Sequence, residues 1–310
     1  MSRIASGVAV GLAAALGLSL AACGGGSKPS SSSNPLAPSA ASSGSVVVGS
    51  ANFPESQLIG EIYAQALDAK GIKVTRRFNI GAREVYYPQV VSCAITVMPE
   101  YNGALLTTSV DKASTAVTTA QVNAALTAKL PSSVEILDSS SAQDKDSVTV
   151  TSATAAKDHL ASISDLASHA KTIVIGGPPE FLTRADGIVG LKKIYGLTFK
   201  QFQPLDEAGP VTVAALKSGK VQAADLFTTD PSILLNKFVV LQDPKNLFAA
   251  QNVTPLVCKK GVNATAVATL NAISAKLTTA GLRDMDKLTG VNKEDYATVA
   301  KNWLSQNGLG

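Results

Sequence analysis

One short stretch, Ala94 to Tyr101, constrains the fold of this chain most strongly. Residues Ala94 to Met98 are apolar or β-branched, which is typical of a strand buried in a parallel sheet. Because Pro99 has no amide hydrogen for a central ladder, we expect the strand to end there, with Glu100 to Gly103 just beyond its carboxyl end. Ligands bind at that edge of open α/β sheets, and Tyr101 brings a large amphipathic ring to it. An ordinary strand-to-helix turn is the alternative.

A weak internal repeat gives this stretch a counterpart later in the chain. The segment from Val90 to Met98 is echoed by the segment from Leu216 to Ala224. At the same offset of 126 residues, Tyr101 corresponds to Phe227. The repeat predicts two similar α/β lobes whose aromatic residues line a cleft between them, which is a common place for a ligand site. The alternative is a chance match.

The N-terminus is typical of an exported lipoprotein. Arg3 precedes an apolar run from Val8 to Ala22 that is too short for a comfortable membrane span. Leu20-Ala21-Ala22-Cys23-Gly24 resembles a bacterial lipobox, in which the cysteine becomes the lipid-modified first residue. An ordinary secretory signal or an uncleaved anchor is the alternative. We therefore expect a signal peptide at 1–22, lipidation of Cys23, and a flexible tether rich in Gly, Ser, Ala and Pro at 23–44.

Charge and cysteine content restrict the partners and the compartment. Arg3 is one of 27 basic residues, so the mature chain carries 26 against 23 acidic residues. Basic and acidic residues are therefore nearly equal in number, and the sequence contains no stripe of basic residues, which argues against a nucleic-acid partner. After lipidation of Cys23, Cys93 and Cys258 remain. An exported compartment permits a disulfide between them, which we predict; two separate buried thiols are the alternative.

Short apolar strands alternate with helical segments throughout the remainder of the chain, which indicates an α/β fold. Two extended segments, 147–151 and 254–258, are expected to cross between the lobes. Lobe I then comprises 45–146 and 253–310, and lobe II comprises 147–252. Near the end of the chain, residues at helical spacing predict a helix that packs on lobe I: Tyr296, Val299, Ala300, Trp303 and Leu304.

Residues for catalysis are scarce. The two histidines, His159 and His169, lie in a polar stretch typical of a solvated surface. The sequence has no G-x-S-x-G, P-loop, H-E-x-x-H or C-x-x-C motif. We predict no catalytic residue, no metal site and no cofactor; a catalytic pair assembled from scattered carboxylates is the alternative.

Five ordered segments carry a family resemblance. They are Val46 to Glu55, Pro99 to Gly103, Ala142 to Lys145, Glu180 to Gly196, and Asp225 to Pro231. Together they resemble the osmoprotectant-binding proteins of ABC importers, the ProX/OpuAC type, which capture glycine betaine, choline, carnitine or proline. The resemblance implies a two-lobed, periplasmic-binding-protein-like fold (type II) with two crossovers and a ligand cleft between the lobes.

The resemblance also implies roles for particular residues. Tyr101 belongs to an aromatic cage, whose ring faces attract a quaternary ammonium that cannot donate hydrogen bonds. Arg184 is the clamp for a ligand carboxylate, and the alternative for it is an ion pair with a neighbour such as Asp186 or Glu180. Further ligand-binding positions lie in the matching segments: Asn52, Phe53, Asn102, Asp144 and Phe227.

Several positions depart from the family pattern. Ala51 stands where relatives often have lysine, Ala104 where they often have threonine, and Phe227 where a cage tyrosine is common. We expect a monomeric, lipid-anchored protein on the outer face of the cytoplasmic membrane, which delivers glycine betaine or a related osmoprotectant to an ABC permease and makes no other membrane contact. A bulkier or more apolar ligand, or a sensing or scaffolding role in the envelope, is the alternative.

Overall fold

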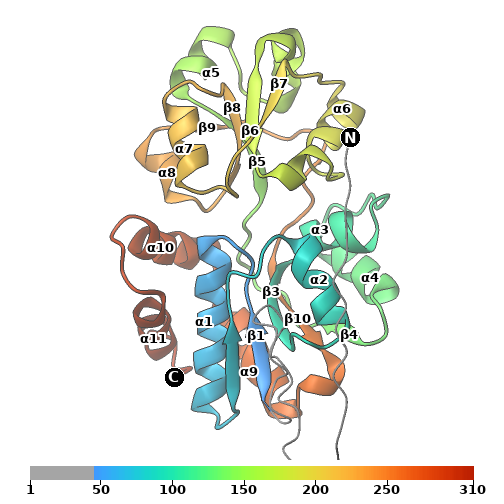
Figure 1. Cartoon of the computed structure of the whole chain (residues 1–310), viewed down its shortest axis with the longest axis vertical. Coiled ribbons are helices and arrows are strands. Elements are labelled where there is room, and N and C mark those ends of the chain that lie inside the picture. The colour runs from blue at the N-terminus through green and yellow to red at the C-terminus, as the bar shows by residue number, and fades with distance from the viewer. Residues whose placement is uncertain (1–44) are drawn as a thin grey trace, which may run out of the picture. The chain divides into compact units, whose positions relative to one another are not determined.

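The structure is a computed structural model and describes residues 45–310. The predicted signal peptide, tether and lipidated Cys23 lie outside the described residues. Within residues 45–310, two five-stranded sheets with helices packed against them form two lobes (Figure 1). The predicted α/β fold with two lobes is therefore confirmed. None of the described helices combines the length and apolar character that crossing a bilayer requires.

The first lobe is built on a mixed sheet. β1 runs parallel to β2 and β3, whereas β10 is antiparallel to β3 and β4. All of β1 and β10 is buried, in keeping with strands covered on both faces. In spatial order the strands are β2 (Val74–Arg77), β1 (Val46–Gly49), β3 (Val97–Tyr101), β10 (Val253–Cys258) and β4 (Val134–Ile136).

Helix α1 (Pro54–Ala69) is the central helix of this lobe. It begins with a proline at its first turn, where a missing amide hydrogen is harmless. It packs against α9, α10 and α11 (Figure 1), and α11 buries Val299, Ala300, Trp303 and Leu304, as its spacing predicted. The remaining helices are α2 (Arg83–Val91), α3 (Asn102–Leu105), α4 (Thr119–Lys129), α9 (Ala264–Lys276), α10 (Thr279–Gly290) and α11 (Tyr296–Gln306), with a π-helical turn at Leu106–Val110 and a 3₁₀ turn at Lys259–Gly261.

The second lobe repeats the plan. β6 is parallel to β7 and β8, and β5 is antiparallel to β8 and β9. In spatial order the strands are β7 (Gln201–Pro204), β6 (Val174–Gly177), β8 (Ala223–Phe227), β5 (Asp146–Val150) and β9 (Val239–Val240). The helices are α5 (Ser152–Asp158), α6 (Ile188–Tyr195), α7 (Pro210–Lys217) and α8 (Pro231–Leu235), with 3₁₀ turns at Ile163–Ser168, Ala170–Thr172 and Pro179–Leu182.

The prediction that a strand ends before Pro99 is wrong, because β3 continues to Tyr101. Pro99 lies opposite Pro255 of β10. Neither proline has a backbone N–H group, so the two residues form a pair that exchanges no backbone hydrogen bonds. On its other side, β3 is paired with β1 only at Val97. Proline is tolerated here because no neighbouring strand requires its missing donor.

The two halves of the internal repeat have matching structures. β3 ends at Tyr101 and β8 ends at Phe227, at the corresponding position of the repeat. The residues that follow α2 and α7 also match, since Cys93 and Gly219 both have positive φ, at 64° and 74°. Glycine adopts this conformation readily, whereas a residue with a Cβ is strained in it.

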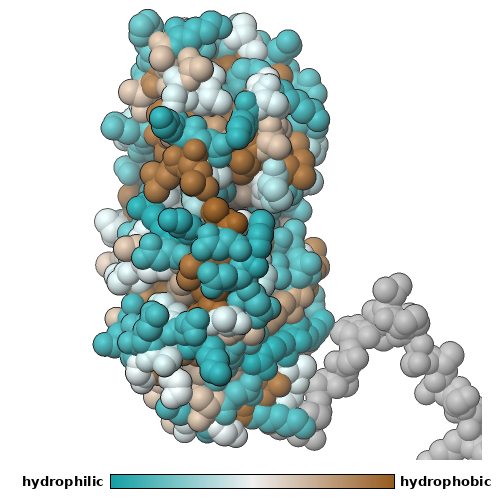
Figure 2. Space-filling view, turned by 90° about the vertical axis from the view of Figure 1, so that its left-hand side faces the viewer, coloured by the Kyte–Doolittle hydropathy of each residue, from teal (hydrophilic) through white to brown (hydrophobic). Residues whose placement is uncertain are grey.

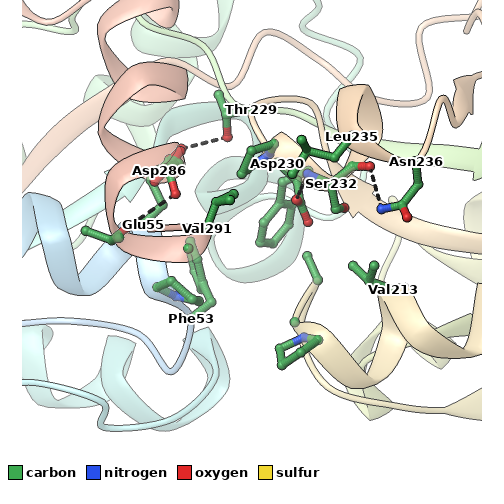
Figure 3. Close-up of a pocket in the computed structure, with 18 of the residues that line it drawn as sticks. Phe53, Glu55, Val213, Thr229, Asp230, Ser232, Leu235, Asn236, Asp286 and Val291 are labelled. Carbon is green, nitrogen blue, oxygen red and sulfur yellow. Dashed lines mark hydrogen bonds between the residues drawn. The ribbon is translucent and has the colours of Figure 1, made fainter. Parts of the chain in front are cut away.

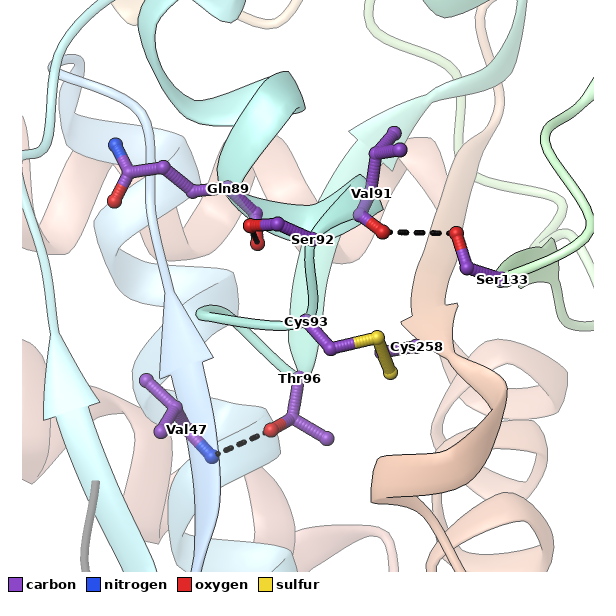
Figure 4. Close-up of a disulfide and its surroundings, with 8 residues drawn as sticks. All are labelled: Val47, Gln89, Val91, Ser92, Cys93, Thr96, Ser133 and Cys258. Atoms are coloured by element: carbon purple, nitrogen blue, oxygen red, sulfur yellow. Dashed lines mark hydrogen bonds between the residues drawn. A yellow bond between two sulfur atoms is a disulfide. The ribbon is translucent and has the colours of Figure 1, made fainter. Parts of the chain in front are cut away.

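Cys93 and Cys258 form a disulfide with their Cα atoms 5.4 Å apart (Figure 4). It joins the turn between α2 and β3 to the end of β10. Nearby, the Ser133 hydroxyl donates to the carbonyl of Val91, and the amide of Val47 donates to the hydroxyl of Thr96 (Figure 4). The cross-link holds the strained Cys93 backbone against the strand that returns from the second lobe.

The predicted crossovers at 147–151 and 254–258 are wrong by a few residues, because those residues form β5 and β10 inside the two sheets. The lobes are joined instead by the segments just before these strands, which lie side by side. The segment before β5 and the segment before β10 form an antiparallel bridge between Gln143 and Asn252. The Gln251 side chain adds two hydrogen bonds to Asp146, one from the Asp146 amide and one to its carboxylate. Gly103 fits here because a Cβ at this position would lie 2.3 Å from the carbonyl oxygen of Ala250. The paired crossovers therefore support the site between the lobes.

Candidate functional site

Three aromatic rings meet between the lobes. Phe53 precedes α1, Tyr101 ends β3, and Phe227 ends β8. The centroid of the Phe53 ring is 5.7 Å from that of Tyr101 and 5.0 Å from that of Phe227. Tyr101 and Phe227, which the repeat predicted to face one cleft, are thus connected through Phe53. Because both strands end at this edge, the sheets themselves fix the positions of two of the rings.

The carboxylate of Glu55 accepts hydrogen bonds from both lobes and fixes one of the three rings. The Tyr101 hydroxyl donates to Glu55 Oε1 at 2.5 Å, and the Thr229 hydroxyl of the second lobe donates to Glu55 Oε2 at 2.7 Å. Burial, with the nearby charge of Glu55, raises the pKa of Tyr101 well above its ordinary value. The phenol therefore stays neutral and acts as a donor, which keeps its ring fixed beside Phe53.

The guanidinium of Arg83 lies at the cavity but is already paired. Its Nε lies 3.2 and 3.1 Å from the two oxygens of Glu100, and Tyr86 donates to Glu100 as well. Burial lowers the pKa of Arg83, but the charge and the hydrogen bond of Glu100, together with the other acidic groups nearby, outweigh burial and hold the pKa well above its ordinary value. Arg83 is a permanent cation whose charge Glu100 balances.

Arg184 is paired across the lobes. Its Nε and Nη2 donate to the two oxygens of Glu84 at 3.1 and 3.0 Å, and its Nη1 lies 3.7 Å from Glu207. The alternative partners named from sequence, Asp186 and Glu180, are not the ones it pairs with among the described residues. Instead, Asp186 accepts a hydrogen bond from Thr107 of the first lobe at 2.9 Å. Both contacts join the lobes to each other.

A small cavity of about 20 Å³ lies between these groups. This volume accommodates about one water molecule, and the hydrogen bonds of Arg184 with Glu84 and of Thr107 with Asp186 hold the lobes together beside it. Both lobes and the crossovers contribute to its walls. Its lining residues are Phe53, Arg83, Tyr101, Ala104, Asp144, Asp146, Arg184, Glu207, Phe227 and Gln251.

Carboxyl groups dominate the electrostatics around the cavity. Burial raises the pKa of Asp144, with the charge of Glu55 as the next cause, and burial raises the pKa of Glu207 to about 7. Among the described residues, Glu207 Oε2 and Asp225 Oδ1 are buried without a hydrogen-bond partner. Because the two arginines are paired with Glu100 and Glu84, the remaining carboxyl groups favour a positively charged ligand.

The residues predicted from sequence separate into two groups. Phe53, Tyr101, Asp144, Arg184 and Phe227 all line the cavity. Asn52 and Asn102 do not line it. Asn52 is exposed, and Asn102 is buried near the crossovers, where its side chain is hydrogen-bonded to Asn123 and to the amide of Asn252.

Sequence reasoning did not select four of the lining residues. Arg83 and Glu207 follow the carboxyl ends of β2 and β7, so the strand-end rule applied to Tyr101 could have found them. Asp146 is the first residue of β5 and Gln251 lies just before β10, where no local pattern marks a side chain that turns toward the cavity.

The sequence and the fold of the chain are similar to those of known proteins. The sequence model of a family described as the substrate binding domain of ABC-type glycine betaine transport system matches residues 44–306. The chain is 26% identical over 276 residues to the glycine betaine-binding protein YehZ of Escherichia coli (strain K12), covering 85% of this chain and 90% of that protein. It is 24% identical over 282 residues to the ergothioneine transport permease/ergothioneine binding protein EgtU of Helicobacter pylori (strain G27), covering 85% of this chain and 48% of that protein.

A solved structure shares the fold. A crystal structure described as a glycine betaine/carnitine/choline ABC transporter superposes with a TM-score of 0.65 at 22% sequence identity, covering 85% of this chain and 99% of the other. Another structure, lactococcal OpuAC in its closed-liganded conformation complexed with glycine betaine, gives a TM-score of 0.60 at 19% identity, covering 85% of this chain and 96% of that chain.

Proposed function

Because the chain belongs to the family of substrate-binding domains of ABC-type glycine betaine transport systems, we propose that it captures a small quaternary ammonium solute between its lobes. The ligand is then delivered to the permease of an ABC importer. Lipidation of Cys23 holds the protein at the outer face of the cytoplasmic membrane, where the folded part acts as a monomer.

The arrangement of aromatic rings beside carboxyl groups is the observation that carries this proposal. A quaternary ammonium offers no hydrogen-bond donor, so it is held by ring faces and by surrounding negative charge. Phe53, Tyr101 and Phe227 supply the rings. The lining also carries the carboxyl groups of Asp144 and of Glu207, which lies 3.7 Å from Arg184. We infer that the cationic end of the ligand lies against the rings.

The pairing of Arg184 with Glu84 affects the choice among quaternary ammonium ligands. A betaine brings its own carboxylate, which would have to compete with Glu84 for the Arg184 guanidinium. Choline carries no carboxylate and requires no such exchange. We therefore propose that a cation such as choline binds more tightly than glycine betaine, and that Arg184 acts as the carboxylate clamp only when a betaine displaces Glu84.

A ligand must enter through an opening of the lobes, since the closed cavity of about 20 Å³ is far smaller than choline. Contacts across the lobes have to separate first. They include Arg184 with Glu84, Thr107 with Asp186, Thr229 with Glu55, and Arg283 with the carbonyl of Thr228. The paired crossovers at Gln143 and Asn252 are the place about which such an opening turns.

A bulkier or more apolar solute is the second candidate. Ala104 and Phe227 both line the cavity, and an alanine and a phenylalanine leave more apolar space than a threonine and a tyrosine. The Helicobacter pylori relative, whose name refers to ergothioneine rather than to glycine betaine, shows that proteins similar to this chain are associated with more than one solute.

Calorimetric titration of the purified folded chain with choline, glycine betaine, carnitine, proline and neutral aromatic solutes tests the proposal. Choline should bind most tightly, and Tyr101→Ala should weaken it by about 0.5–2 kcal/mol. Tyr101→Phe is the matched control, because it keeps the ring and removes only the hydroxyl. Tight binding of a neutral aromatic solute alone would favour the second candidate, and the absence of binding by any of the five would contradict both.

A further inference from the structure

A larger groove of about 470 Å³ lies between the lobes beside the small cavity. The rings of Phe53 and Phe227 line both spaces and form the partition between them. Figure 3 shows Glu55 and Asp286 on one wall, from α1 and α10, with Val213 and Leu235 on the other, from α7 and α8. The groove is therefore a separate compartment with walls from both lobes.

The outer part of the groove is apolar. Two exposed apolar side chains line it, Leu235 and Val291, with exposed fractions of 59% and 40%. Figure 2 shows apolar side chains gathered on the face that carries α7, α8 and α10. An apolar body that enters this groove would remove these side chains from water, which is favourable in proportion to the area covered.

At its inner end the groove is lined by a carboxyl group, that of Asp286, to which no side chain or backbone group of the described residues donates a hydrogen bond. Asp286 is 7% exposed and lines the groove, and neither of its oxygens has a hydrogen-bond partner among the described residues. The group beside it is Glu55, another carboxyl group. Two carboxyl groups in contact are stable only if they share a proton or hold a cation between them. Burial, followed by the charge of Glu55, raises the pKa of Asp286 accordingly.

The other charged groups of the groove do not satisfy Asp286. Asp230 accepts from the amide of Ser232 in its own helix cap, and Glu207 lies beside Arg184 on the far side of the groove. Lys217 and Lys293 are exposed at the rim, where solvent and salt screen their charge. The inner end of the groove therefore lacks a donor, whereas the rim does not.

We propose that this groove is a second ligand site, which binds a primary ammonium ion carried on an apolar body. The ammonium N–H groups donate to Asp286 and Glu55 in place of a shared proton, and the apolar body lies between Val213 and Leu235. A quaternary ammonium, which has no N–H, cannot supply these hydrogen bonds. The site thus differs in chemistry from the aromatic cavity, and it does not rest on the proposed function.

Calorimetric titration of the folded chain with benzylammonium chloride tests the site. The probe has the required ammonium and a compact apolar ring, and benzyl alcohol is its neutral counterpart. Benzylammonium should bind at least about tenfold more tightly than benzyl alcohol, because a hydrogen bond to a charged group is worth more than one factor of ten. Equal affinities of the two probes would overturn the proposal.

Two variants locate the binding. Asp286→Asn keeps the size of the side chain and should weaken benzylammonium at least about tenfold, whereas Asp284→Asn on the exposed face of α10 should leave it unchanged. Leu235→Trp fills the groove at a largely exposed position, so the fold should tolerate it while binding falls. Binding that survives both Asp286→Asn and Leu235→Trp, or that Asp284→Asn weakens equally, would show that the probe binds elsewhere and refute the site.

Discussion

Replacing Glu84 with glutamine should shift the ligand-free protein toward an open arrangement of its lobes. Glu84 lies at the start of α2 in the first lobe and accepts both hydrogen bonds of the Arg184 fork from the second lobe. Glutamine keeps the size and one acceptor oxygen but removes the negative charge. The substitution therefore weakens a contact that exists only when the lobes are closed.

The exposure of the two partners sets the magnitude. The Arg184 side chain is 7% exposed and that of Glu84 is 45% exposed. Exposed ion pairs contribute about 0–1 kcal/mol, and removing one partner of a buried pair costs about 3–5 kcal/mol. Because only Arg184 is buried and Glu207 remains near it, we expect Glu84→Gln to destabilise the closed state by about 1–2 kcal/mol. This free energy corresponds to a change of about 5- to 30-fold in the ratio of open to closed molecules.

Spin labels at two exposed lysines, Lys192 on α6 and Lys276 on α9, report the distance between the lobes. In ligand-free Glu84→Gln the population at the longer distance should increase. Choline affinity should fall by no more than the same factor, since the ligand then has to supply the closing free energy. Glu180→Gln is the matched control, because Glu180 belongs to the same lobe as Arg184 and takes part in no ion pair within residues 45–310.

The two classes of ligand should respond differently. Glu84→Gln releases the Arg184 guanidinium for a ligand carboxylate, so the affinity for glycine betaine should rise relative to that for choline. If the distance distribution and both affinities match those of Glu180→Gln, the pair does not hold the lobes closed and the reasoning is wrong.

Three further predictions concern other parts of the molecule. Burial raises the pKa of Glu207 from 4.5 to about 7. The protonated carboxyl group therefore stabilises the closed state fully below about pH 4.5, and this contribution is lost as the group ionises when the pH rises through about 7. Because a bound cation favours the ionised carboxylate, choline affinity should increase between about pH 5 and about pH 8, and a Glu207→Gln variant with the same pH profile would contradict the assignment. Replacing Cys93 and Cys258 together with serine should lower the free energy of unfolding by about 2–4 kcal/mol, which denaturant unfolding measures; an unchanged midpoint would show that the cross-link contributes nothing. Cys23→Ala should abolish lipid labelling and release the protein from membranes, and membrane retention of the fully processed variant would refute the lipobox assignment.

Local patterns in the sequence predicted elements whose side chains are covered on a regular face. The helix Tyr296–Gln306 is found where helical spacing predicted it, with Val299 and Trp303 among its buried residues, because burial of one helix face requires that periodicity. The repeat likewise placed Tyr101 and Phe227 at equivalent strand ends. Motif resemblance added Phe53, Asp144 and Arg184 to the same site.

Pro99 shows where local reasoning fails. Its effect on a strand depends on whether a neighbouring strand needs its amide hydrogen, and the neighbour, Pro255, lies far along the chain. The disulfide was predicted correctly, but only from the exported compartment and the two remaining cysteines, because cysteines separated by 165 residues carry no local signal that they meet. Both outcomes follow from the path of β10 back into the first sheet.

The sequence by itself determined the α/β class, the two similar halves and the aromatic side chains at their strand ends. Only the tertiary structure decided how those side chains are used. Arg184 meets Glu84 a hundred residues away, and Glu55 bridges Tyr101 to Thr229. The free energy of such contacts depends on which charges come together and how far water is excluded from them, and neither is fixed until the lobes close on each other.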